Sequence, residues 1–144
     1  MNNIENIRPL IGKVSNLIDS AQSYVSKAIN TGMILLYWQI GKSIQEEVVK
    51  YEKAEYGERV MKNLGEQLSN LYGRGYGYRN LLRMLGFYKS FPDQEIVTTL
   101  SSQLSWSHIV EIIKQKDVLK REFYISMCIN ERWSVRELSS RRNC

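Results

Sequence analysis

The segment 71–92 combines positive charge with aromatic and amide side chains, which is the combination that binds nucleic acids. It contains four cations and no acidic residue, and tyrosines are interleaved with the cations. Arg and Lys neutralise backbone phosphates, and Arg and Asn form paired hydrogen bonds with guanine and adenine, respectively. The candidate nucleic-acid-binding residues are Arg74, Tyr76, Arg79, Asn80, Arg83 and Lys89. A solvated helix face with tyrosines in the core explains the same pattern, and for a charge run alone this simpler interpretation is favoured.

The charge is uneven along the chain. The 144 residues carry a formal net charge of +5, and residues 1–70 hold eight basic and eight acidic side chains. Residues 71–144 hold twelve basic and seven acidic side chains, so the whole excess lies in the second half. An anionic partner would therefore bind there, and we expect DNA to be that partner.

The residue types exclude most enzyme chemistry. The chain has one histidine, His108, and two cysteines, Cys128 and Cys144, so the ligands for a His/Cys metal site are too few and too scattered. No phosphate-binding loop of the GxxxxGK[ST] type is present. We expect no catalytic residue, no metal and no cofactor, and we expect His108 to cap a helix or to be partly buried.

Cysteine usage and hydropathy indicate a cytoplasmic protein. Two cysteines, one of them the last residue, cannot form a disulfide framework, which fits a reducing compartment. The longest apolar run, Met33–Trp38, has six residues and is far too short to span a bilayer. We therefore expect a cytoplasmic localisation without membrane contact.

Helical periodicity runs through the chain, and no stretch alternates for long enough to predict a strand. The predicted fold is all-α, with long N-terminal helices followed by a helix–turn–helix-like multi-helix bundle. The predicted division is a helical hairpin or coiled-coil-like arm over 1–50 and a helical domain over 51–144. Shorter helices are predicted to follow the cap residues Ser107, Asp117 and Ser134.

The helix–turn–helix-like segment covers residues 58–91. Two amphipathic helices are predicted over 58–72 and 78–91, with Gly57 as a break before them. The apolar face of the second helix is predicted to carry Leu81, Leu82, Leu85 and Tyr88. The turn 73–77 has three glycines and is longer and looser than a compact helix–turn–helix turn. Arg74 and the backbone amides of this turn therefore favour phosphate binding over base-specific reading.

The first 35 residues carry a heptad pattern of apolar residues. One series recurs at Ile4, Ile11, Ile18 and Val25, and a second recurs at Ile7, Val14, Ala21 and Ala28. Apolar spacing sustained over four heptads is typical of a helix that packs along another helix. That partner is either a second copy or the chain's own next helix. We expect a homo-oligomer through residues 4–35, with a dimer slightly favoured over a trimer.

Five segments, taken in order, resemble one known family. They are LLYWQIGKSI (35–44), AEYGERVMKNLGEQL (54–68), YGRGYGYRNLLRMLGFYKSFP (72–92), LSWSHIVEIIK (104–114) and REFYISMCINERWSVREL (121–138). Together they resemble the N-terminal domain of YhcG-type bacterial proteins over nearly the whole chain. The resemblance implies an all-α DNA-binding domain with helix–turn–helix-like parts, which in that family is followed by a nuclease domain of the PD-(D/E)xK type.

The residues of this chain do not supply that nuclease site. A PD-(D/E)xK site needs a lysine two residues after an acidic metal ligand, and none of the fifteen Asp and Glu residues has one. Pairs at three-residue spacing, such as Glu111 with Lys114, are expected to be surface ion pairs. We therefore expect a DNA-binding and assembly module of a nuclease-type protein, without nuclease activity. The alternative is an oligomerisation or protein-interaction module with no direct nucleic-acid contact.

Overall fold

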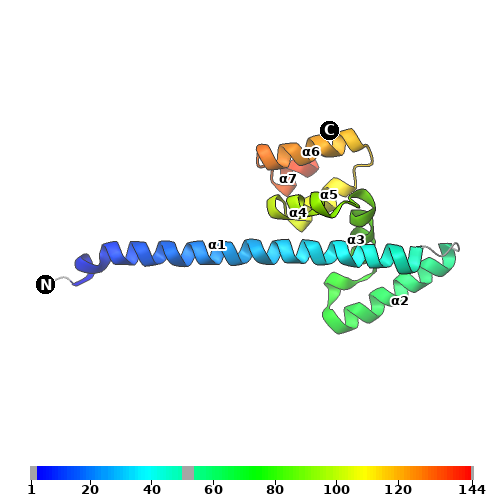
Figure 1. Ribbon diagram of the computed structural model, residues 1–144, viewed down its shortest axis with the longest axis horizontal. Helices are drawn as coiled ribbons and strands as arrows, with labels where there is room; N and C mark the ends of the chain where they lie inside the picture. The colour runs from blue at the N-terminus through cyan, green and yellow to red at the C-terminus, as the bar shows by residue number, and fades with distance from the viewer. Residues whose placement is uncertain (1–2, 50–53, 144) are drawn as a thin grey trace.

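Seven α-helices and no strand make up the described part of the chain, residues 3–49 and 54–143, in the computed structural model (Figure 1). The predicted all-α class is confirmed. The helices are α1 (Asn3–Ile44), α2 (Ala54–Tyr72), α3 (Tyr78–Ser90), α4 (Gln94–Gln103), α5 (Trp106–Ile113), α6 (Val118–Asn130) and α7 (Val135–Arg142). A π-helical turn, η1 (Gln45–Val49), extends α1, and a 3-10 turn, η2 (Arg74–Tyr76), precedes α3. The division predicted between residues 50 and 51 falls outside the described residues and stays a prediction.

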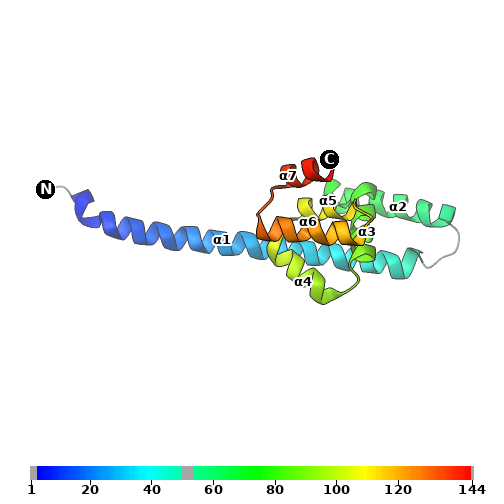
Figure 2. The same cartoon turned by 90° about the horizontal axis from the view of Figure 1, so that it is seen from above.

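The helix α1 is one continuous helix of 42 residues, with Pro9 inside it. Its N-terminal part projects as an arm beyond all the other helices (Figures 1 and 2). Residues 6–28 are exposed throughout, and from Asn30 onward α1 packs against α3 and α4. No helix in the described ranges is long and apolar enough to cross a membrane. The molecule is thus a long arm attached to a body of short helices.

The larger core cluster joins α1 to the C-terminal helices. Trp38 of α1 is almost fully buried, and its indole Nε1 donates a hydrogen bond to the backbone carbonyl of Phe91 at 2.8 Å. The buried residues around these two are Ile34, Phe87, Val97, Leu100, Leu104, Ile109, Ile112, Ile113, Cys128 and Leu138. They come from α1 and from every helix from α3 to α7, so these helices share one core with the second part of α1. Cys128 is a core residue.

The smaller core cluster joins α1 to α2 and α3. Its buried residues are Tyr37, Ile44, Val48, Met61, Leu81, Met84 and Leu85. Two glycines allow the backbones to approach closely here. A Cβ on Gly41 of α1 would overlap the carbonyl group of Met84 in α3, and a Cβ on Gly65 of α2 would lie 2.6 Å from the backbone nitrogen of Tyr78. The helix α3 therefore crosses both neighbours with almost no space between the backbones.

Two helix starts differ from the prediction. The helix α2 begins at Ala54 and continues through Gly57, so this glycine does not break it. The cap of α5 is Ser105 and not Ser107, because the Ser105 hydroxyl accepts from the backbone N–H of His108. His108 completes this capping box through its Nδ1, and its Nε2 lies 2.8 Å from the carbonyl of Trp133. The capping role expected for His108 is thus observed.

The sequence pattern does not predict α4. Its segment QEIVTTLSSQ is rich in Ser and Thr, which have modest helix propensity. Contacts with α1 stabilise it, because the side chains of Asn30 and Thr31 donate hydrogen bonds to the carbonyls of Leu104 and Ser101, at 3.0 and 3.1 Å. The local signal is Asp93, which follows a proline and accepts from the backbone N–H of Glu95 as the N-cap.

The close contact at Gly41 leads to a stability prediction. We expect Gly41→Ala to lower the free energy of unfolding by about 2 kcal/mol, because the new methyl group must push α3 away and overpacking of this kind is destabilising. Gly32→Ala is the matched control in the same helix, since its Cβ would meet nothing within 4 Å. It should raise the free energy of unfolding by up to about 1 kcal/mol. Urea unfolding followed by tryptophan fluorescence measures both, and equal midpoints would contradict the close contact.

Candidate nucleic-acid interface

One face of α3 is exposed and carries positive charge. The residues that α3 buries are Leu81, Met84, Leu85 and Phe87. Because these follow the spacing of one helix face, the opposite stripe is open to solvent. Three cations lie on it, Arg79, Arg83 and Lys89, and α3 contains no acidic residue. We call these three residues the basic face of α3.

The buried face of α3 is rotated relative to the predicted one. Leu82 is 41% exposed although its spacing predicts burial, whereas Met84 and Phe87 are fully buried. The cause is that α3 contacts α1, α2 and α5 on different sides, so its apolar surface is set by three neighbours rather than one. The rotation leaves Leu82 beside the cations of the basic face.

Two open hollows lie between α3 and α5. The larger, of about 460 Å³, includes Asn80 and Arg83 on the α3 side and Trp106, Ser107, Glu111 and Lys114 on the α5 side. The smaller, of about 220 Å³, is lined by Leu82, Arg83, Gly86, Val110, Ile113, Lys114 and Lys116. Arg83 and Lys114 line both hollows, so each hollow has a positively charged side chain on its α3 side and another on its α5 side.

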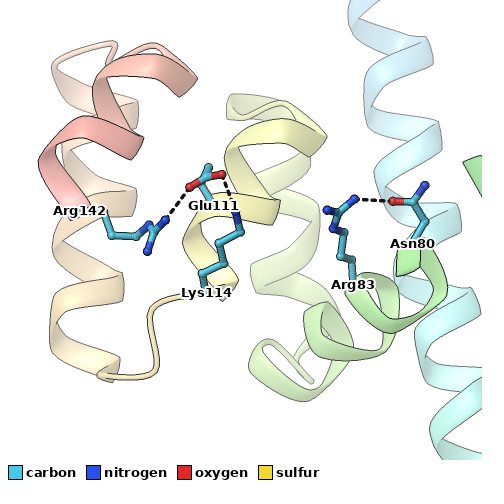
Figure 3. A network of polar contacts seen from close by, with 5 residues as sticks. All are labelled: Asn80, Arg83, Glu111, Lys114 and Arg142. Atoms are coloured by element: carbon cyan, nitrogen blue, oxygen red, sulfur yellow. Dashed lines mark hydrogen bonds and ion pairs between the residues drawn. The ribbon is translucent and has the colours of Figure 1, made fainter. Parts of the chain in front are cut away.

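The charged groups of this region form two separate sets (Figure 3). Within α3, the Arg83 guanidinium donates a hydrogen bond to Oδ1 of Asn80 at 2.8 Å. Across the α5 side, the Glu111 carboxylate accepts from Lys114 at 2.8 Å and from Arg142 at 3.0 Å. The hydrogen bond from Lys114 holds the pKa of Glu111 below its ordinary value, and Arg142 adds to this against the opposing effect of burial. Glu111 is therefore ionised and paired with two cations, so it does not cancel the charge of Arg83.

The comparisons with known proteins identify the family. Residues 13–143 match the family model of the DUF1016 N-terminal domain. The chain belongs to this family. It is also 28% identical, over 155 aligned residues, to the Escherichia coli (strain K12) protein named "Putative nuclease YhcG". That match covers 87% of this chain and 41% of the relative, so the chain spans about two fifths of the relative's length. No solved structure matches the chain significantly.

The resemblance to YhcG-type proteins is thus confirmed, and the predicted site residues of this DUF1016 N-terminal domain can be placed. Asn80 and Arg83 line the larger hollow, while Arg79 and Lys89 lie on the exposed stripe of the same helix. Tyr76 is half-buried, with its ring centroid 6.3 Å from Tyr37 and 5.8 Å from Tyr72. These contacts hold the turn against α1, and the role of Tyr76 in nucleic-acid binding stays a prediction.

The glycine turn uses three of its five backbone N–H groups for its own hydrogen bonds. The N–H groups of Gly73, Tyr76 and Gly77 donate to carbonyls within the chain, at distances of 2.8 to 3.2 Å. Gly73 has a φ of 104°, which a residue with a side chain rarely adopts. These three amides are satisfied within the chain, and the turn also presents the exposed side chain of Arg74.

The α5 wall is the part of the site that sequence reasoning missed. Lys114 and Lys116 lie beside Arg83 only because α5 packs on α3, and no local motif indicates that contact. Trp106 of α5 packs against Phe87 and Tyr37, with ring centroids 5.6 and 4.8 Å away, and it also lines the larger hollow.

Glu111 should link the stability of the domain to pH. Because its pKa is lower in the folded chain than in the unfolded chain, its stabilisation is complete above the unfolded-state pKa and is lost as the pH falls through the folded-state pKa. We expect the free energy of unfolding to decrease below about pH 4, and Glu111→Gln to show a smaller decrease. Urea unfolding between pH 3 and pH 7 measures this.

The control for this prediction is Glu137→Gln. Glu137 forms an exposed ion pair with Arg141 at 3.6 Å, and such pairs contribute little, so this change should alter the free energy of unfolding at pH 7 by less than about 0.5 kcal/mol. Glu111→Gln should cost more at pH 7, because it leaves the half-buried Arg142 without its carboxylate. If Glu111→Gln and the wild type had the same pH dependence, the proposed role of this ion pair would be wrong.

Proposed function

We propose that this DUF1016 N-terminal domain binds the phosphate backbone of DNA through the basic face of α3 together with Lys114 and Lys116. The observation that carries the proposal is that Arg83, Lys114 and Lys116 line one hollow, while Arg79 and Lys89 are exposed on the same helix as Arg83. The acidic side chain that lines the larger hollow, Glu111, pairs with Lys114 and Arg142, so these three side chains together still carry a net positive charge. A surface of this kind attracts a polyanion by releasing its condensed counterions.

Phosphate contacts fit this surface better than base reading. A recognition helix in the major groove presents free polar side chains near its N-terminus. Here α3 is held by α1, α2 and α5, and the Asn80 amide already accepts a hydrogen bond from Arg83. Exposed Arg and Lys side chains contact phosphate oxygens without inserting a helix into a groove. We therefore expect binding that depends strongly on salt and weakly on base sequence.

The similarity to YhcG supports a role beside a nuclease. That relative is more than twice as long as the region that matches this chain, and its name describes a nuclease. We infer that the domain holds DNA for a nuclease domain of the kind that YhcG-type proteins carry. In this arrangement, the domain supplies affinity and position, and the cleavage chemistry takes place elsewhere.

A protein-interaction module without DNA contact is the second candidate function. The observation that favours it is the exposed apolar side chains of the α1 arm, which resemble a surface for another helix. The salt dependence of DNA binding separates the two candidates. For a domain that contacts phosphates, the logarithm of the DNA-binding constant decreases linearly with the logarithm of the salt concentration. A domain without such contacts shows no salt-sensitive DNA binding.

The basic face of α3 can be tested directly with Arg79→Ala/Arg83→Ala. Both side chains are exposed, so the double variant should fold normally. We expect weaker binding to a short duplex, and a salt slope that is smaller by about 0.9 for each phosphate that the variant no longer neutralises. Fluorescence anisotropy at three or more salt concentrations gives both quantities.

The matched control is Lys13→Ala/Lys27→Ala, which removes the same charge from exposed positions on the arm. Its affinity and salt slope should remain close to those of the wild type. A folded Arg79→Ala/Arg83→Ala variant with unchanged affinity and slope would exclude this face. A wild-type domain that binds no duplex even at low salt would exclude the proposed function itself.

A further inference from the structure

The arm of α1 exposes a long apolar surface that the rest of the described chain does not cover. Nine large apolar residues between positions 7 and 29 are each at least 43% exposed. They are Ile7, Leu10, Ile11, Val14, Leu17, Ile18, Tyr24, Val25 and Ile29. Most helices depend on packing of their apolar face for stability, so a helix of this length needs a partner along it.

These residues lie along one stripe of the helix, and charge is kept off it. In heptad notation, with Ile11 and Ile18 at position a and Val14 and Ala21 at position d, Leu10, Leu17 and Tyr24 fall at position g. The charged residues between positions 6 and 29 are Arg8, Lys13, Asp19 and Lys27, at positions e, c, b and c. Eight of the nine apolar residues thus lie at a, d and g positions and Ile29 lies at position e, a pattern typical of a helix buried against another helix.

We propose that a second copy of this chain covers the stripe, with the two arms antiparallel. In the proposed register, each core residue i faces residue 32 − i of the second copy, so that Ile11 faces Ala21. This inference goes beyond the proposed function, because it does not depend on DNA. It assigns a partner, a direction and a register to a surface that the single chain leaves open.

The sizes of the core residues favour the antiparallel direction. Reversing one helix places every a position opposite a d position of the other copy. Ile11 then faces Ala21 of the second copy, and Val14 faces Ile18 of the second copy. A large residue is thereby opposed by a smaller one in each of these layers. In a parallel pair, Ala21 would face Ala21 and leave a void.

The flanking positions point to the same direction. In an antiparallel pair, g positions lie beside g positions, so Leu17 meets Leu17 and Leu10 meets Tyr24 of the second copy. The apolar residues at the g positions are then covered by one another. In a parallel pair, g positions lie beside e positions, which would set Leu10 against Ser15, Leu17 against Gln22 and Tyr24 against Ile29. Two of these three contacts would leave apolar surface against polar side chains.

The body limits the register. The arm meets the body at Asn30 and Thr31, whose side chains bond to the carbonyls of Leu104 and Ser101. In the proposed register, Ile7 faces Val25 of the second copy, so the facing pairs end before the body begins. If the second arm moved by one heptad toward the body, Ile7 would lie opposite Gly32, beside α4. If it moved by one heptad away from the body, one layer of facing core residues would be lost.

The area involved is that of a stable dimer. The nine apolar residues expose on the order of 800 Å² per copy, and standard interfaces bury about that much on each partner. Pairing would place the two bodies at opposite ends of the joined arms, because each body begins where the facing pairs end.

Disulfide cross-linking tests the direction and the register together. In a Cys144→Ser background, Val14→Cys and Ile18→Cys chains are prepared separately and then mixed under oxidising conditions. Positions 14 and 18 face each other in the proposed pair, and a disulfide needs the two Cα atoms within about 7 Å. Cys128 can stay, because it is buried and burial raises its pKa to about 11, which makes it a poor nucleophile.

The mixture should form a covalent dimer on a non-reducing gel, and each variant alone should form at least tenfold less. A covalent dimer from Val14→Cys alone, as strong as that from the mixture, would show a parallel pair and overturn the proposed direction. The same cross-linking with Leu10→Cys or Ile7→Cys in place of Val14→Cys is the control for register, since neither position faces Ile18.

Light scattering at micromolar concentration tests the association itself. We expect the wild type to have the mass of a dimer and Ile11→Asp/Ile18→Asp to have the mass of a monomer with a folded body. Asn16→Asp/Ser23→Asp adds the same charge on the opposite side of the arm and should stay dimeric. A monomeric wild type would overturn the proposal. So would an Ile11→Asp/Ile18→Asp variant whose body unfolds, because that would place these residues in the chain's own core.

Discussion

The crossing of α1 and α3 at Gly41 is the contact on which the rest of the body depends. Because Gly41 has no side chain, the Met84 carbonyl approaches the backbone of α1 directly. The two core clusters meet at this crossing, with Trp38 on one side and Tyr37 on the other. The crossing also fixes the rotation of α3. With Met84 and Phe87 turned inward, Arg79 and Arg83 have only the solvent side available.

The sequence predicts the helices with strong local signals well. Asp117 and Ser134 cap α6 and α7, and the all-α class follows from a periodicity that leaves no room for strands. It does not predict α4, whose Ser and Thr residues are held by side chains of α1, or the true face of α3, which three neighbours determine. Cap residues act within a few positions of the chain, whereas those two features depend on residues far apart in the sequence.

The sequence likewise predicts only those parts of the candidate site that lie close together along the chain. The basic face of α3 is visible in the sequence because its cations follow one another along a single helix. Lys114 and Lys116 become part of the surface only through the packing of α5 on α3, which no local pattern indicates. The arm is simpler, since its heptads are local and most of them remain free of the body. The chain thus divides into a body with a cationic surface, for which we propose DNA as the partner, and an arm with an apolar surface, for which we propose a second copy.

The most direct test of the central claim is a map of backbone amide chemical shifts of the ¹⁵N-labelled domain during titration with a short DNA duplex. We predict that the largest shifts cluster at residues 79–89 of α3 and at residues 107–116, on the exposed sides described above, and that they disappear when salt is raised. Shifts confined to α2 or to the arm, or none at all at low salt, would contradict the proposal that the α3–α5 surface binds DNA.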